Sequence, residues 1–121
     1  MAKVFLDANY FIDVVERDRT IDFSKFLNHS LFVSPLSVHI LCYVYRYKVP
    51  QESLRHLGKY FILVAFDEVV TQRAIVGPTK DFEDNVQLHS AAEASCDFFL
   101  TRDERLRKLK FFGKTQIVSL L

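Results

Sequence analysis

The chain has 121 residues, of which 50% are hydrophobic and 26% charged, and its formal net charge is +1. This length and composition fit a single domain with a filled core and exclude a disordered or low-complexity chain. The small net charge excludes a protein held on nucleic acid by its overall charge alone.

No apolar run approaches the roughly 20 residues that a membrane span needs, and the N-terminus has no signal-peptide pattern. We therefore expect a cytoplasmic protein with no membrane partner. Cys42 and Cys96 lie in no paired metal or redox motif, which favours buried free thiols. With 12 Phe and 5 Tyr, the small core is expected to leave some aromatic side chains exposed for a partner or for self-association.

The hydrophobic pattern predicts an alternation of strands and helices. In chain order we expect a strand at 4–6, helices at 7–17 and 20–29, a strand at 30–34, helices at 36–48 and 50–61, a strand at 62–66, helices at 67–76 and 81–95, a strand at 98–100, a short basic helix at 104–110 and a strand at 116–120. Thr20 is the expected cap of the second helix. Short, uniformly apolar strands are typical of strands covered on both faces. The sequence therefore predicts one α/β domain over residues 1–121, a three-layer α/β/α sandwich with a central parallel sheet of about four to five strands.

Acidic residues follow the predicted strands at one edge of this sheet. Asp7 comes after the first strand and Asp103 after the strand at 98–100, while Asp81, Glu83 and Asp84 open the helix that leads into that strand. Ligands of parallel α/β sheets bind beyond the carboxyl ends of the strands. Carboxylates that converge there repel one another unless a cation neutralises them, and hard oxygen ligands suit Mg²⁺ or Mn²⁺. The residues alone thus suggest metal-assisted phosphate chemistry.

Most of these acids also have an ordinary structural explanation. Three of them stand where a helix N-cap is expected, Asp7, Asp81 and Asp103. Glu83 lies in a first turn, where it complements the helix dipole. Asp84 is different, because it shares a helix face with Leu88 and a solvated acid is unexpected there. No single acid identifies a site, whereas the presence of several acids at one edge of the sheet is a more specific indication of a metal site.

Three segments resemble PIN domains. Residues 4–13 (VFLDANYFID) resemble the opening strand and turn, 81–84 (DFED) with Leu88 and Ala91 resemble the second acidic helix, and 99–103 (FLTRD) resemble the strand and turn near the C-terminus. The match covers essentially the whole chain in the correct order, and its size fits the small toxin-like branch.

The resemblance implies a Rossmann-like parallel sheet, a Mg²⁺ or Mn²⁺ ion and cleavage of RNA. It carries over Asp7, Asp84 and Asp103 as metal-site and catalytic carboxylates. The supporting residues that we expect around them are Asn9, Thr101, Glu83 and Asp81. Many small members are the toxin of a toxin–antitoxin pair and many form dimers, so an antitoxin protein and a homodimer are the expected partners.

One acid of the family pattern is missing. PIN domains usually carry a Glu on the helix after the second strand, where this chain has Ile40, and no Asp or Glu occurs from Phe23 to Gln51. His39 is a candidate substitute, although a lone histidine on an apolar helix is more often a packing residue. The later acid of the C-terminal turn is also absent, with Glu104 the nearest candidate. Because losses around a metal can lower affinity or activity by roughly 10–100-fold, a slow nuclease and a non-catalytic module that binds RNA or protein both stay open.

A basic cluster follows Asp103 and can steer a phosphate backbone to the acids. It consists of Arg102, Arg105, Arg107, Lys108 and Lys110, of which Arg102, Arg105 and Lys108 are the candidate RNA contacts. The alternative is a solvated helix face. Tyr43, Tyr45 and Tyr47 cannot all share one helix face, which favours packing or a dimer surface over base stacking.

A third hypothesis is a phosphatase or phosphotransferase of the haloacid-dehalogenase or receiver type, in which Asp7 is the nucleophile. Asn9 stands where the haloacid-dehalogenase pattern has a second Asp, and no Lys is clearly placed after a late strand. The sequence therefore favours a divalent-metal endoribonuclease over this alternative.

Overall fold

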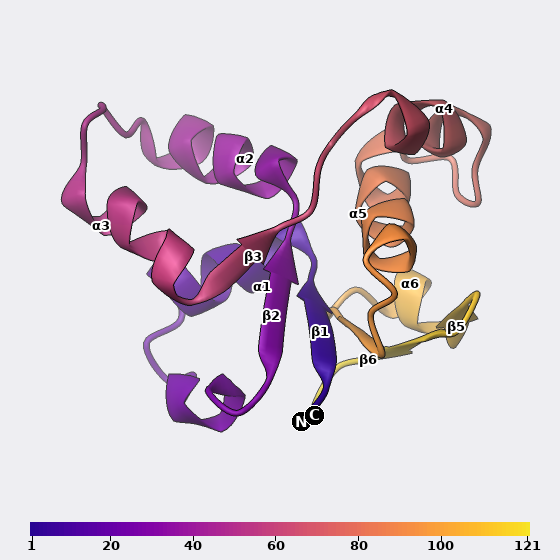
Figure 1. The fold of residues 1–121 in the computed structure, drawn as a ribbon, viewed down its shortest axis with the longest axis horizontal. Helices are drawn as coiled ribbons and strands as arrows, with labels where there is room; N and C mark the ends of the chain where they lie inside the picture. The colour runs from indigo at the N-terminus through magenta and orange to yellow at the C-terminus, as the bar shows by residue number, and fades with distance from the viewer.

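One sheet of six strands runs through the molecule in the order β3-β2-β1-β4-β6-β5 (Figure 1). The computed structural model describes all residues 1–121. Five of the strands are parallel: β1 (Lys3–Leu6), β2 (Ser30–Val33), β3 (Phe61–Leu63), β4 (Phe98–Leu100) and β6 (Thr115–Val118). The predicted parallel sheet is confirmed.

The sixth strand, β5 (Phe111–Phe112), was not predicted, and it pairs antiparallel with β6. A two-residue loop joins the two strands, and its first residue, Gly113, has a φ of 59°. A tight hairpin requires such a positive φ, which glycine adopts without strain. Gly113 therefore turns the chain between two strands.

Helices cover both faces of the sheet and complete the three predicted layers (Figure 1). One face carries α1 (Ala8–Ile12), η1 (Asp13–Arg17), η2 (Phe23–Phe26), α2 (Pro35–Tyr45), α3 (Glu52–Arg55) and η3 (His56–Lys59). The other side carries α4 (Glu68–Val76), α5 (Phe82–Glu93) and α6 (Glu104–Arg107). None of these helices combines the length and the apolar character needed to cross a membrane.

Successive residues of the central strands enter different cores. Val4 and Leu6 belong to the core under α1 and α2, whereas Phe5 belongs to the core under α5 and stacks on Phe99 at 5.6 Å between ring centroids. Side chains of a strand alternate between the faces of a sheet, so a strand buried on both sides must be apolar at every position. This explains the uniformly apolar strands of the sequence.

Several predicted helices are shorter or more irregular than expected. The helix expected at 7–17 is a short α-helix followed by the π-helical turn η1, and the one at 20–29 is only the 3-10 turn η2. The side chain of Asp22 caps η2, so the prediction of Thr20 as its cap was wrong. The helix expected at 50–61 is divided into α3 and η3, and the basic helix ends at Arg107.

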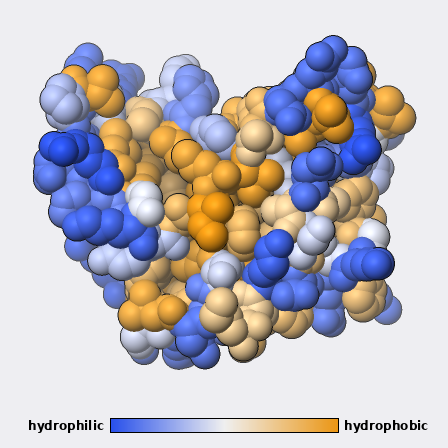
Figure 2. All heavy atoms as spheres, viewed as in Figure 1, coloured by the Kyte–Doolittle hydropathy of each residue, from blue (hydrophilic) through white to orange (hydrophobic).

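Both cysteines are free thiols, as expected, but only Cys96 is buried while Cys42 is partly exposed. Burial raises the pKa of the Cys96 thiol to about 12. Most aromatic side chains lie in the cores, and the strongly exposed ones include Tyr43. Figure 2 shows hydrophobic atoms gathered in the middle of one face between hydrophilic flanks. The edge strand β3 has Ile62 and Leu63 about half exposed, at 49% and 58%.

Candidate functional site

The carboxyl ends of β1 and β4 bring Asp7 and Thr101 together. Asp7 is 7% exposed and Thr101 is fully buried. The Thr101 hydroxyl donates a hydrogen bond to Oδ2 of Asp7, and the backbone N–H of Tyr10 donates to its Oδ1 at 2.7 Å. Asp7 is therefore the N-cap of α1, and Thr101 holds its other oxygen.

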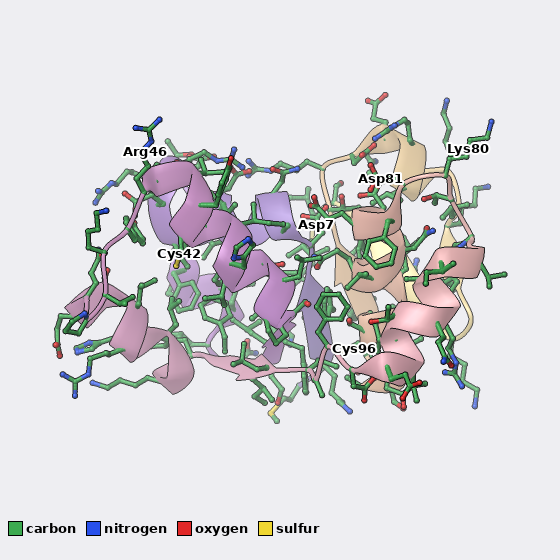
Figure 3. The ribbon with its side chains drawn as sticks, turned by 90° about the horizontal axis from the view of Figure 1, so that it is seen from above. Asp7, Cys42, Arg46, Lys80, Asp81 and Cys96 are labelled. Atoms are coloured by element: carbon green, nitrogen blue, oxygen red, sulfur yellow. The ribbon has the colours of Figure 1, made fainter.

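Helix α5 presents three acids at the same edge of the sheet. Asp81 caps the helix by accepting the Asp84 N–H at 2.9 Å, and Figure 3 shows Asp81 at the start of α5 with Asp7 between α5 and α2. The carboxylates of Glu83 and Asp84 accept no hydrogen bond from any group of the chain. Asp84 is only 21% exposed at its side chain. These two acids thus have no local structural task.

A buried amide that the sequence did not single out anchors the start of α5. Asn85 is 2% exposed, and its Nδ2 donates to the carbonyls of Ala74 and Thr79 at 2.9 Å each. Its Oδ1 accepts from the N–H and the hydroxyl of Thr79. Since Asn85 follows Asp84 directly, this network fixes the position from which the acids project. The sequence signal that could have identified Asn85 is its place next to the apolar helix position Val86, where a polar side chain needs a buried partner.

Asp103 completes the acidic group from the turn after β4. Its backbone N–H donates to the Thr101 hydroxyl at 3.0 Å, and its carboxylate caps α6 through the N–H of Arg105 at 2.8 Å. The guanidinium of Arg105 lies 3.1 Å from Asp103 Oδ2 and 4.0 Å from Asp84 Oδ2. Arg105 is therefore a cation within the acidic group, in contact with its members and not only beside them.

The carboxylates shift one another's pKa values. Burial, followed by the charges of Asp81, Asp103 and Glu83, raises the pKa of Asp84 to about 6. Burial is also the main cause that raises the pKa of Asp7, and the Asp103 carboxylate adds to it. The hydrogen bond from Arg105 lowers the pKa of Asp103. These couplings mean that the acids of β1, α5 and the β4–α6 turn form one electrostatic unit.

Glu83 belongs to the same unit. Its pKa is raised by burial and then by the charges of Asp81 and Asp7. The acids that the sequence predicted to meet at one sheet edge, Asp7, Asp81, Glu83, Asp84 and Asp103, are therefore brought together by the fold.

Two predicted site residues have other partners. The Asn9 side chain is exposed and accepts from Arg17 at 3.4 Å, so its hydrogen bonds do not reach Asp7. Arg102 pairs with Asp13 at 3.2 Å and with Asp18 at 3.3 Å, and it lies over the Tyr10 ring at 5.0 Å. It therefore ties the β4–α6 turn to η1. Lys108 is exposed and in no ion pair.

Helix α2 contributes serines and apolar side chains to this edge instead of an acid. Ser34 caps the helix, and the fully buried Ser37 hydroxyl is 3.1 Å from Nε2 of Gln87 on α5. Ile40 packs against the core, and the exposed His39 lies against Tyr43. The position of the expected Glu is therefore apolar, and neither Ser37 nor Gln87 was identified from the sequence.

The donor set fits a divalent cation. All the candidate ligands are carboxylate oxygens, which Mg²⁺ and Mn²⁺ prefer, and Mg²⁺ needs only one or two carboxylates because it keeps several waters. As the side chains stand, no three acidic, His or Cys groups converge closely enough to enclose an ion. Arg105 provides the positive charge between Asp84 and Asp103 in this arrangement.

Comparisons with known proteins identify a family and a fold. A family model described as PIN domain matches residues 3–105. The fold is similar to a chain in the crystal structure of VapBC2 from Rickettsia felis bound to a DNA fragment from their promoter. The two chains have a TM-score of 0.66 and 11% sequence identity over 96% of this chain and 97% of that one. No curated protein sequence matches the chain.

Proposed function

The chain belongs to the PIN domain family, whose members are generally metal-dependent nucleases, and we propose that it is an endoribonuclease that uses Mg²⁺ or Mn²⁺. Metal-dependent nuclease chemistry is the chemistry of the family. The proposal that this chain performs it rests on the acidic residues that the fold brings together at the sheet edge.

One observation carries the proposal: the carboxylate of Asp84. It is largely buried, accepts no hydrogen bond and has a pKa raised to about 6 by burial and by its acidic neighbours. Buried charges in proteins are normally paired or bound to a metal. An acid kept in this position with no hydrogen bond, and with the exposed Arg105 no nearer than 4.0 Å, is expected where a cation and a substrate complete the site.

The residues that would hold the ion are Asp7, Asp84 and Asp103. A bound Mg²⁺ or Mn²⁺ supplies an activated water and stabilises negative charge on a phosphodiester. Thr101 fixes Asp7 and the backbone of Asp103 through one hydroxyl, which sets the spacing of two of the three carboxylates. The side chain of Arg105 is largely exposed, at 77%, so it can turn from the acids towards a phosphate group.

We further propose that the protein is the toxin of a toxin–antitoxin pair and acts in the cytoplasm as a homodimer. The similarity to a chain of a VapBC2 complex supports an antitoxin partner. The half-exposed Ile62 and Leu63 of the edge strand β3 leave apolar surface for a protein contact.

The second candidate is a non-catalytic PIN module that binds RNA or protein. It is favoured by Ile40 in place of the usual acid and by Arg105, which already neutralises two of the carboxylates. A site with one ligand fewer has a lower metal affinity.

Cleavage of a mixed RNA pool by the purified protein separates the two candidates. The assay is run with Mg²⁺, with Mn²⁺ and with EDTA, beside Asp7→Asn, Asp84→Asn and the matched surface variant Glu68→Gln. We expect metal-dependent products from the wild type and from Glu68→Gln, and none from the two site variants. If the folded wild type yields no products at any metal concentration, the binding module is correct.

A further inference from the structure

Helix α2 begins at the acidic site and leads away from it. Its cap, Ser34, ends β2 at the carboxyl edge of the sheet, and Ser37 in its first turn meets Gln87 of α5. Figure 3 shows α2 running from beside Asp7 to Arg46 at the far side of the molecule. From Ser37 to its last residue, Tyr45, the helix advances ~12 Å at ~1.5 Å per residue. A ligand lying along α2 therefore has one end at the acids.

The outer face of α2 carries aromatic side chains, and basic residues follow the end of the helix. His39 and Tyr43 are four residues apart, which places them on one helix face. Arg46 is the left-handed C-cap directly after the last helical residue, Tyr45. Tyr43 is 78% exposed, and its ring lies 6.3 Å from that of His39 at an interplanar angle of 33°. Tyr45 and Tyr47 differ from Tyr43, because both pack against the core. The structure thus leaves one tyrosine ring of the three free for a ligand.

This face is also positively charged. Between Phe23 and Gln51 every charged residue is basic, and neither Arg46 nor the exposed Lys48 forms an ion pair. The acidic site repels a phosphate backbone, so a nucleic acid needs cations nearby to remain bound. Arg102 is occupied by Asp13 and Asp18, whereas Arg46 and Lys48, just after α2, have no internal partner.

We propose that single-stranded RNA binds along the outer face of α2 and the segment that follows it (His39 and Tyr43 of the helix, Arg46 and Lys48 after it), called here the α2 face, and reaches the acidic site at the N-terminal end of α2. This inference rests on the proposed function and specifies its substrate. A base stacks on Tyr43, and Arg46 and Lys48 contact phosphates. The substrate is single-stranded because the bases of a duplex are already stacked on one another and cannot cover an aromatic side chain.

The test measures binding apart from cleavage. A fluorescent single-stranded RNA is titrated with the full-length Asp7→Asn protein in EDTA, and anisotropy gives the Kd. Base–aromatic stacking is worth about 1–3 kcal/mol, so adding Tyr43→Ala is expected to weaken binding by about 5- to 150-fold. Tyr43→Phe keeps the ring and should bind normally. Arg46→Ala is expected to reduce the slope of log K against log salt by about 0.7. Tyr60→Ala replaces an exposed tyrosine directly after η3; it is the matched control and should leave RNA binding unchanged.

The outcomes distinguish this inference from the proposed function. If Tyr43→Ala binds RNA as tightly as Tyr60→Ala, the α2 face is not the binding surface, even if the wild type cleaves RNA. If Tyr43→Ala leaves RNA binding intact but dissociates a dimer in sedimentation, the α2 face is a protein interface and the inference is wrong. If binding is lost in Tyr43→Ala while the wild type never cleaves, the α2 face stands and the nuclease proposal fails.

Discussion

Replacing Asp84 by Asn is predicted to stabilise the folded protein at neutral pH while it removes nuclease activity. Asp84 is held in the fold with a pKa raised from the ordinary 3.8 to about 6, because it is buried beside Asp81, Asp103 and Glu83. An acid whose pKa is higher in the folded than in the unfolded chain binds protons more tightly when folded. Its ionisation therefore destabilises the fold as the pH rises through this range.

The size of the effect follows from the pKa difference of about two units. At ~1.36 kcal/mol per unit the ceiling is ~3 kcal/mol. The Asp84 side chain is 21% exposed and Arg105 is 4.0 Å away, so water and this cation screen part of the charge. We expect Asp84→Asn to raise the free energy of unfolding at pH 7.5 by about 1–2 kcal/mol in metal-free buffer. At pH 4 the acid is protonated in the fold and only partly ionised in the unfolded chain, so most of the difference should disappear.

Urea denaturation between pH 4 and pH 8 in EDTA measures this difference. Glu68→Gln, which replaces an exposed acid at the start of α4, is the matched control and should follow the wild type throughout. The reasoning is refuted if Asp84→Asn is less stable than the wild type at pH 7.5, or if its advantage is the same at pH 4 and pH 7.5.

Three further predictions concern side chains around the site. Thr101→Val removes the hydroxyl that joins Asp7 to the Asp103 backbone and leaves Asp7 with one hydrogen bond fewer, so the free energy of unfolding in urea should fall by about 1–3 kcal/mol; an unchanged midpoint contradicts this. Arg105→Ala removes the cation between Asp84 and Asp103, so calorimetry should show tighter Mn²⁺ binding, and weaker binding would mean that Arg105 does not compete with the metal. Ser90→Ala deletes the one buried side-chain polar atom without a hydrogen-bond partner, so thermal unfolding should occur at a higher temperature. A lower unfolding temperature would show that the Ser90 hydroxyl contributes to stability.

The acidic site could be predicted because short local patterns determine it. Asp7 and Thr101 each follow an apolar strand directly, and once β1 and β4 pair in parallel these residues must be neighbours. The position of Asp84 followed from helical spacing with Leu88, which is fully buried. These inferences required only the positions where strands end and the residues that share one face of a helix.

The contacts that the sequence did not reveal depend on packing between distant segments. Ser37 and Gln87 are 50 residues apart and meet only because α2 crosses the edge of the sheet next to α5. Arg102 looked like a free cation in a basic run, but the π-helical turn η1 places Asp13 within reach of it. Strand β5 is two residues long, too short for an alternating pattern to be visible.

The most direct test of the metal site is a Mn²⁺ titration of the full-length protein followed by its backbone amide NMR spectrum, because the paramagnetic ion broadens signals close to it. The account predicts broadening centred on Asp7, Asp84 and Asp103, with loss of the effect in Asp84→Asn and stronger binding in Arg105→Ala. Broadening centred elsewhere, or none at millimolar Mn²⁺, would show that the carboxylates hold no ion and that Arg105 is their permanent partner.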